Sequence, residues 1–218
     1  MKKHLLITGT GRTGTTFLMR LFSRLGLETG FKPDAPVDPK SHAGLEYPLH
    51  RLASWMGKPD CPRVIKNPAL SESLAPMLER KQFAVEHVLI PVRDLYQAAE
   101  SRRYVQSLSP GVPPHVRVDG GLISAGRQEV SLARRLHNLI VTVARFDLPY
   151  TILLFPRLAT DTRYLYERIG HLDGMGLWEP FAAACLETCR PELIHEFSPG
   201  MPFPATDANR PSKTGRPG

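Results

Sequence analysis

The sequence predicts an α/β fold in which a parallel β-sheet is flanked by helices. Short apolar runs typical of strands alternate along the chain with longer segments whose apolar residues follow helical spacing. The run from His87 to Val92 is nearly all apolar, as expected for a strand that is covered on both faces. Strands that alternate with helices in this way form parallel sheets, because each helix carries the chain back to the edge where the previous strand began.

The first strand and the first helix are joined by a turn rich in glycine. Residues 4–8 predict a short strand, and from Thr15 the apolar residues follow helical spacing until Gly26 ends the helix. The next segment, residues 30–62, contains six prolines and little periodicity, so we expect mostly loop with one short helix at 49–56. A long irregular segment inside a compact domain usually serves a function.

The centre of the chain continues the alternation of strands and helices. Residues 63–66 predict a short strand, and residues 71–80 predict a helix whose middle is strained by Pro76. The nearly apolar strand described above comes next. Asp94 then stands where it can cap a helix over residues 95–106.

The second half of the chain predicts one long helix and three shorter elements. Residues 107–127 carry prolines and a glycine pair and are predicted to be loop. A strand at 150–155 and helices at 160–169 and 180–189 follow the long helix. The long helix is predicted from apolar residues in steps of three and four, namely Leu132, Leu136, Leu139, Val143 and Phe146.

These elements fit a single domain over residues 1–196. The chain has 218 residues, of which 42% are hydrophobic, and this is enough apolar material for one core. Residues 197–218 are rich in proline and glycine and poor in apolar residues, so we expect a disordered tail.

The charge of the chain points to anionic partners. Lys and Arg number 28 against 21 Asp and Glu, which gives a net charge of +7 with His neutral. The basic residues are scattered and form no run of five or more, so no polybasic arm for nucleic acid or for stable membrane binding is expected. A positive field focused into a cleft fits this pattern better.

Cysteine content and apolar runs predict a cytoplasmic protein without a metal. Three cysteines are too few for a disulfide-stapled domain, and a reducing compartment is the expectation. No apolar run is long enough for a signal-peptide core or a membrane span. Cys185 and Cys189 stand four positions apart on a predicted helix, but no His or further Cys nearby completes a set of zinc ligands.

Three chemistries compete for the glycine-rich turn. Gly9, Gly11 and Gly14 match the dinucleotide fingerprint, but a proline-rich loop follows where that fold needs a second strand ending in an acidic residue. The same turn has the glycine spacing of a Walker A loop, but Thr15 stands in place of the phosphate-binding lysine. What remains is a nest of backbone N–H groups with threonine hydroxyls and one cation, Arg12. That set suits a smaller anionic group.

Two separated motifs resemble those of sulfotransferases that use 3′-phosphoadenosine 5′-phosphosulfate (PAPS). Residues 11–16, with the sequence GRTGTT, are similar to the 5′-phosphosulfate loop of this family, in which Lys or Arg precedes Ser/Thr-Gly-Thr. The family also has an apolar strand that ends in Arg, followed by a helix with Ser eight positions later, and Arg93 and Ser101 reproduce this spacing. The chain looks like a compact bacterial-type member. The resemblance implies a three-layer P-loop fold and transfer of a sulfuryl group from PAPS to a hydroxyl or amine, with no metal.

The resemblance also implies a role for each residue of the two motifs. Arg93 and Ser101 would bind the 3′-phosphate of the donor, and Arg12 and Lys66 are candidate catalytic cations beside the leaving oxygen. Lys66 ends a short strand and is similar to a Lys-x-Pro element of the family, although a solvated surface lysine fits the sequence equally well. The residues implied to bind the 5′-phosphosulfate are Gly11, Arg12, Thr13, Gly14, Thr15 and Thr16.

A general base must accept the proton of the acceptor, and members of the family use Glu or His. The loop after the first helix offers four candidates, Glu28, Asp34, His42 and Glu46. Glu46 is preferred, because a glycine-punctuated and otherwise apolar setting raises the pKa of a carboxyl group. His42 is the alternative.

The acceptor is expected to be a small molecule, a carbohydrate or a lipid. Four aromatic residues are candidates both for lining its pocket and for ordinary packing, namely Phe31, Tyr47, Trp55 and Tyr104. The sequence departs from the family in one respect. Many cytosolic members have a basic, glycine-containing segment near the C-terminus that covers the 3′-phosphate, and this sequence has no such segment. Residues 117–127, with Arg102 and Arg103, are the candidates to supply those cations instead.

Two other functions remain open from the sequence. A P-loop kinase-like phosphotransferase would need Arg12 to replace the missing lysine, and the nearest approach to its acidic strand end is Asp94. A non-catalytic nucleotide- or anion-binding module would keep the nest of N–H groups without turnover, because a phosphate nest specifies binding and not reaction.

Overall fold

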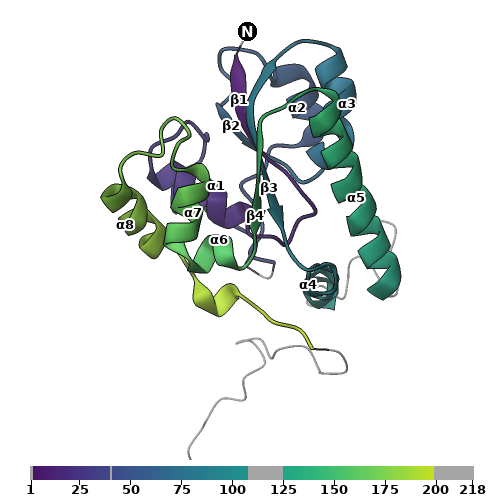
Figure 1. The fold of residues 1–218 in the computed structure, drawn as a ribbon, viewed down its shortest axis with the longest axis vertical. Helices are drawn as coiled ribbons and strands as arrows, with labels where there is room; N and C mark the ends of the chain where they lie inside the picture. The colour runs from purple at the N-terminus through teal and green to yellow at the C-terminus, as the bar shows by residue number, and fades with distance from the viewer. Residues whose placement is uncertain (1, 40, 108–124, 199–218) are drawn as a thin grey trace, which may run out of the picture.

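The computed structural model describes residues 2–39, 41–107 and 125–198 (Figure 1). Within these ranges the strands form one sheet of order β2-β1-β3-β4, and every neighbouring pair is parallel. The prediction of a parallel sheet flanked by helices is confirmed. The strands are β1 (Lys3–Ile7), β2 (Val64–Lys66), β3 (Ala84–Val92) and β4 (Tyr150–Leu154).

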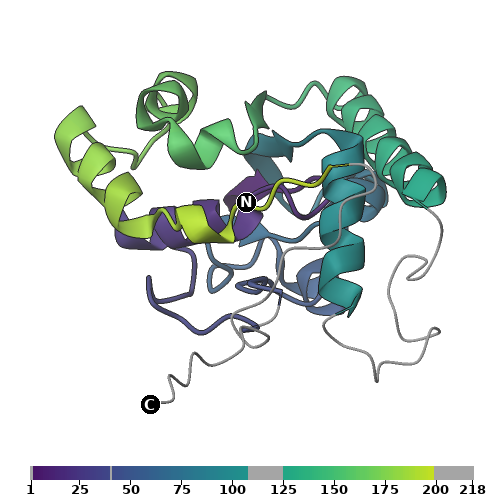
Figure 2. The same ribbon diagram turned by 90° about the horizontal axis from the view of Figure 1, so that it is seen from below.

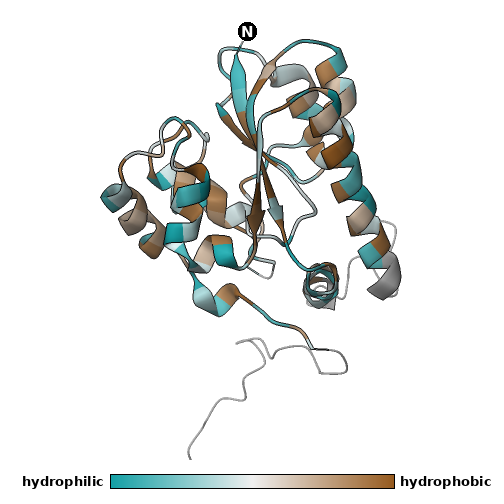
Figure 3. Cartoon of the chain, viewed as in Figure 1, coloured by the Kyte–Doolittle hydropathy of each residue, from teal (hydrophilic) through white to brown (hydrophobic). Residues whose placement is uncertain are grey.

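Helices cover both faces of the sheet. One apolar cluster joins the sheet to α1, α6, α7 and α8, and a second joins its opposite face to α2, α3 and α5. Helix α4 packs on α5 through a third, smaller cluster. The central strands are strongly hydrophobic (Figure 3), as expected of strands covered on both faces. The helices are α1 (Thr15–Arg24), α2 (Leu49–Trp55), α3 (Leu70–Glu79), α4 (Leu95–Ser107), α5 (Ala125–Arg145), α6 (Arg157–Thr160), α7 (Thr162–Ile169) and α8 (Trp178–Thr188).

Several element boundaries differ from the predicted ones. Strand β3 begins three residues early, because Ala84 and Val85 already pair with β1. The helix predicted over 160–169 is divided in two, since Asp161 accepts a hydrogen bond from the N–H of Tyr164 and so caps α7 as a separate helix. The cap predicted at Asp94 is present, with its carboxylate accepting from the N–H of Gln97 at 3.0 Å.

Parts of the predicted loop and tail fall outside the described residues. The loop predicted at 107–127 is helical at both ends, in α4 and α5, and residues 108–124 are not described. The tail was expected from residue 197, yet Phe197 is buried and exchanges two hydrogen bonds with the side chain of Gln97. Residues 199–218 lie outside the described part.

Strand β4 is an edge strand with one open side. Tyr150, Ile152 and Leu154 alternate along it and are exposed, whereas Leu153 between them is buried.

No helix among the described residues is long and apolar enough to cross a membrane.

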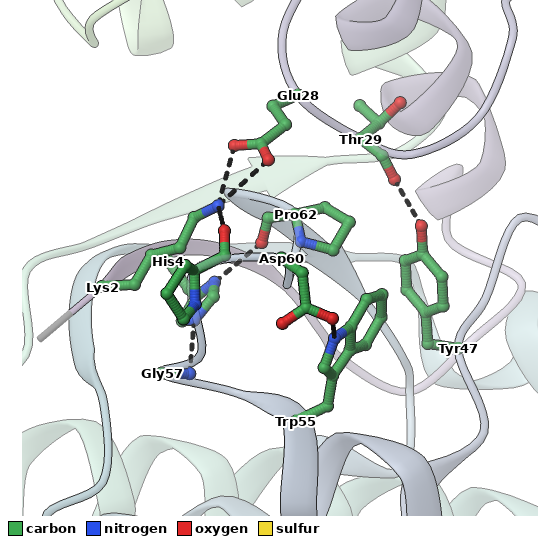
Figure 4. Close-up of polar contacts among 10 residues, drawn as sticks. Lys2, His4, Glu28, Thr29, Tyr47, Trp55, Gly57, Asp60 and Pro62 are labelled. Atoms are coloured by element: carbon green, nitrogen blue, oxygen red, sulfur yellow. Dashed lines mark hydrogen bonds and ion pairs between the residues drawn. The ribbon is translucent and has the colours of Figure 1, made fainter.

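The proline-rich segment between α1 and β2 is loop except for α2, as predicted, and polar contacts hold it to the sheet (Figure 4). The Nζ atom of Lys2 donates to both carboxylate oxygens of Glu28 and to the carbonyl of Pro59. The hydroxyl of Tyr47 donates to the carbonyl of Thr29 at 2.9 Å. These contacts fix a long loop that has little regular hydrogen bonding of its own.

His4 is the buried centre of these contacts. Gly57 donates its N–H to Nε2 of His4 at 3.0 Å, and Nδ1 lies 2.8 Å from the carbonyl of Pro62. Because Nε2 must accept, Nδ1 carries the single proton of a neutral ring. Burial lowers the pKa of His4 below its ordinary value of 6.5.

We therefore expect the free energy of unfolding to fall in mild acid because of His4. Below pH 6.5 the unfolded chain binds a proton at His4 that the folded chain does not, so stability rises with pH through this window. One such group contributes a slope of up to about 1.4 kcal/mol per pH unit. Urea unfolding between pH 5 and 7.5 should show a shallower slope for His4→Gln, and an unchanged slope for His50→Gln, which alters an exposed residue of α2. Equal slopes in wild type and His4→Gln would contradict the assignment.

Candidate functional site

A cavity of about 680 Å³ lies at the carboxyl edge of the sheet. Figure 2 views the molecule from this edge, where the segment after α8 crosses from α8 toward α4. In open parallel sheets ligands bind at this edge, because loops and helix N-termini converge there. Its lining within the described residues includes seven cations and three carboxylates, Arg12, Arg20, Lys66, Arg93, Arg102, Arg135 and Arg190 against Glu46, Glu72 and Glu192.

The glycine turn between β1 and α1 forms one wall of the cavity. Gly11, Arg12 and Gly14 all have positive φ, at 73°, 60° and 83°. Gly14 precedes α1, and no side chain caps the N-terminus of that helix. The first backbone N–H groups of α1 are therefore left for an anion, in the direction that the helix dipole favours.

Arg12 spans the cavity from the turn to two other segments. Its Nε donates to the hydroxyl of Ser101 on α4 at 3.1 Å, and its Nη1 donates to the carbonyl of Ser41. Burial, with a smaller contribution from Arg93, lowers the pKa of Arg12 to about 10. Within the described residues no carboxylate pairs with this guanidinium. Its hydrogen-bond partners are neutral oxygens, which leave its positive charge in place.

Lys66 ends β2 inside the same cavity and is only 1% exposed. Its Nζ contacts Glu46 Oε1 at 2.9 Å, the carbonyl of Gly44 at 2.6 Å and Thr16 Oγ1 at 3.1 Å. The interpretation of Lys66 as a solvated surface lysine is wrong. Burial lowers the pKa of Lys66, and the nearby Glu46 opposes this shift.

Glu46 lies in a different setting from the predicted one. We expected apolar surroundings, but its carboxylate faces the Lys66 ammonium and is 35% exposed toward the cavity. Of the four candidate bases, Glu46 and His42 line the cavity. Glu28 is paired with Lys2 and Asp34 with Arg24, and neither lines it.

Arg93 follows β3 and points into the cavity beside Phe155, whose ring centroid lies 4.9 Å from the guanidinium carbon. Its Nη2 donates to the carbonyl of His195 and lies 3.4 Å from Gln97 Oε1. Arg93 forms no ion pair with a carboxylate in the described part of the chain, and the nearby Glu100 pairs with Arg103. Burial lowers the pKa of Arg93.

The two predicted motifs thus meet at one cavity, with two differences in detail. Ser101 contacts Arg12 and not Arg93, so the hydroxyl of α4 is held by the cation of the glycine turn. Thr13 is fully buried and does not line the cavity, so it brings no hydroxyl there. The predicted loop residues that do line it are Gly11, Arg12, Gly14, Thr15 and Thr16.

The segment after α8 contributes residues that the sequence did not predict. Arg190, Glu192 and His195 line the cavity, and Tyr104 of α4 packs against the His195 ring with centroids 5.3 Å apart. Burial and the neighbouring Arg12 lower the pKa of His195. This segment carries no sequence motif, so only its position in the fold shows that it is part of the cavity wall.

Basic residues outside the two motifs also converge on the cavity. Arg102 lines it and donates to the carbonyl of Thr10 at 2.6 Å, and its role as a substitute cation stays a prediction. Arg103 pairs with Glu100 and does not line it. Arg135 of α5 also lines the cavity, and its guanidinium lies 3.2 Å from the carboxylate of Glu72. The helical spacing of residues around Arg135 did not predict that it would line the site.

The aromatic residues proposed for the acceptor pocket do not line the cavity. Phe31, Tyr47 and Trp55 pack on one another, with ring centroids 4.9 and 5.1 Å apart. The aromatic residues that do line it are Phe17 and Phe155.

Comparisons of this chain with protein-family models, curated proteins and solved structures gave no match. Within the described ranges no group of three or more His, Cys, Asp or Glu side chains is arranged to hold a metal ion. The site is therefore interpreted from its own residues.

The close packing of the glycine turn yields a test. A Cβ at Gly14 would lie 2.9 Å from Phe155 and 3.0 Å from Leu158, whereas at Gly26, with nearly the same φ, it would meet nothing within 4 Å. Gly26→Ala should cost about 1–2 kcal/mol of unfolding free energy, from left-handed strain alone. Gly14→Ala should cost at least about 1 kcal/mol more, from overpacking. Urea unfolding of both variants measures the difference, and equal losses would show that the turn is not packed as described.

Proposed function

We propose that the protein is a PAPS-dependent sulfotransferase of the P-loop type, transferring a sulfuryl group to a hydroxyl or amine. The observation that carries this proposal is the meeting of two separated motifs at one cavity, where Arg12 of the first donates to Ser101 of the second, 89 residues away in the chain. Each motif alone would be a weak signal. Their shared cavity is what a single nucleotide with two phosphate-bearing ends requires.

The residues at the cavity fit such a donor. The uncapped N-terminus of α1 and the left-handed turn at Gly11 and Gly14 offer backbone N–H groups to a sulfonate or phosphate. Arg93 and Arg102 present guanidinium groups that match a phosphate, at the cost of releasing the carbonyls that now accept from them. Burial of Arg12 and Lys66 favours an anionic ligand, since it would offset their desolvation.

The cations would act on the charge that moves during transfer. The donor supplies an activated sulfuryl group; the bond from sulfur to the acceptor atom forms as the bond from sulfur to the bridging oxygen breaks. The electron pair of the broken bond stays on the phosphate. Arg12 and Lys66 are placed at the turn where that negative charge would increase, and stabilisation of developing charge is the main contribution expected of such a site.

Glu46 is the proposed acceptor of the proton that leaves the attacking group. Its carboxylate lines the cavity and is held by Lys66, which fixes its position while leaving it partly open. The contact between Lys66 and Glu46 would also keep the base beside the cation that faces the donor. His42, on the same loop and also at the cavity, is the alternative base.

The kinase alternative receives less support from the residues present. Asp94, its nearest candidate for a metal-binding carboxylate, caps α4 and does not line the cavity. Thr15 occupies the position of the phosphate-binding lysine. A non-catalytic anion-binding module is separated from the proposed enzyme by the turnover test below.

Nucleotide binding tests the proposal directly. Adenosine 3′,5′-bisphosphate should raise the melting temperature without magnesium, and ATP with magnesium should not, because a ligand that binds only the native state stabilises it. Arg93→Ala should weaken binding of the bisphosphate by about 2 kcal/mol or more, as loss of a charge-assisted contact does. Calorimetric titration measures this. Arg145→Ala, which removes an exposed arginine of α5 paired with Glu79, is the matched control. An unchanged dissociation constant in Arg93→Ala would remove Arg93 from the site.

Turnover tests the role of Glu46. Glu46→Gln should leave bisphosphate binding intact and lower kcat by about 10²-fold or more, because a general base contributes on this order. Glu28→Gln is the control, since Glu28 lies on the same segment between α1 and α2 but outside the cavity. Release of bisphosphate from PAPS in the presence of acceptor gives the rate. Full activity in Glu46→Gln would assign the base to His42 or elsewhere, and binding without turnover in wild type would favour the non-catalytic module.

A further inference from the structure

Four arginines of the cavity lie outside both nucleotide motifs; Arg102 is on α4 and Arg135 on α5, and the other two are Arg20 and Arg190. Arg20 is on the second turn of α1, and Arg190 follows α8. They line the cavity together with Phe17, Val37 and Ile194. The donor already has Arg12, Lys66, Arg93 and Arg102 available at the turn and at α4. Two further cations are more than the donor requires.

Arg20 is placed beside the loop that carries the proposed base. Its Nη2 lies 3.5 Å from the carbonyl of Ala35, at the limit of a hydrogen bond, and Ala35 belongs to the same loop as His42 and Glu46. Its Nε is buried without a hydrogen-bond partner in the described part of the chain. A buried donor without a partner costs free energy that an anionic ligand would recover.

Arg190 approaches the cavity from α8. Its Nη1 donates to the carbonyls of Glu187 and Cys189, which hold the side chain at the end of the helix. Among residues 2–39, 41–107 and 125–198, neither Arg190 nor Arg20 forms an ion pair with a carboxylate. The two guanidinium groups therefore bring positive charge to the cavity without a directly paired carboxylate in the described part of the chain.

Arg24 shows the opposite arrangement one turn further along α1. It pairs with Glu187 at 2.6 Å and with Asp34 at 3.3 Å, and it does not line the cavity. Its two carboxylates tie α1 to α8 and to the loop, which is an ordinary structural role. The Nε atoms of both arginines are buried without a hydrogen-bond partner in the described part of the chain, so the two residues differ in their ion pairs and in their place: Arg24 is paired with carboxylates away from the cavity, and Arg20 lines the cavity without one.

We propose that Arg20 and Arg190 bind an oxyanion of the acceptor, a carboxylate or a sulfonate-type group, while the nucleophilic hydroxyl of the acceptor faces Glu46. The proposal rests on the proposed function and names the substrate class: a hydroxyl compound that is already acidic. A planar guanidinium fork suits either oxyanion. Phe17 and Phe155 of the lining supply the apolar surface for the part of the acceptor between its two polar ends.

The test compares acids with neutral analogues of the same shape. One pair is 4-hydroxybenzoate and 4-hydroxybenzamide, and the other is 4-hydroxybenzenesulfonate and 4-hydroxybenzenesulfonamide. Binding is measured by calorimetric titration to protein saturated with adenosine 3′,5′-bisphosphate. In at least one pair the acid should bind about tenfold tighter or more, and that pair tells which oxyanion the acceptor bears. The preference should disappear in Arg20→Gln and fall in Arg190→Gln.

Arg24→Gln is the matched control and should keep the preference, because Arg24 is outside the cavity. No preference for the acid in either pair, or a preference that survives in Arg20→Gln, would overturn the proposal. The titration with bisphosphate is recorded first on each protein, so failure of the donor to bind is seen separately. In that case the same comparison on nucleotide-free protein still decides whether Arg20 binds an oxyanion.

Discussion

The site depends on positive charge that the fold removes from water without supplying enough negative charge to neutralise it. Arg12 and Lys66 both line the cavity, and burial lowers the pKa of both. Glu46 compensates Lys66 directly, but within the described residues no carboxylate pairs with Arg12 or Arg93. Desolvated charge of this kind is costly, and an anionic ligand would reduce the cost. The proposed donor and the proposed acidic acceptor both follow from this excess charge.

Backbone carbonyls take the place of anions around the cavity. Arg12 donates to Ser41, Lys66 to Gly44, Arg93 to His195 and Arg102 to Thr10, in each case to the main-chain oxygen. A neutral oxygen satisfies the hydrogen-bond geometry of a cation but leaves its charge in place. An incoming phosphate would thus exchange a weaker partner for a stronger one. The carbonyl of His195 belongs to the segment that crosses the carboxyl edge of the sheet (Figure 2), so that segment and the proposed ligand would share Arg93.

The structure distinguishes between candidate site residues that the sequence pattern alone could not separate. Glu28, Asp34, His42 and Glu46 are all plausible bases in sequence, and the fold brings only the last two to the cavity, because Lys2 and Arg24 hold the others elsewhere. Lys66 was equally a surface residue or a site residue until the order of the strands placed the end of β2 next to the end of β1. Of the two roles left open for the aromatic candidates, Phe31, Tyr47 and Trp55 take ordinary packing, because their rings pack in one cluster away from the cavity.

The sequence by itself determined the alternation of strands and helices, the cap at Asp94, the glycine turn and the two motifs, because each depends on local backbone chemistry or on the spacing of neighbouring residues. It could not determine that Ser101 would meet Arg12, that Arg190 and His195 would reach the cavity, or that Arg20 would lack a carboxylate where Arg24 has two. These are contacts between segments far apart in the chain. They are decided only when a parallel sheet brings the carboxyl ends of its strands to one edge and the C-terminal segment packs across it.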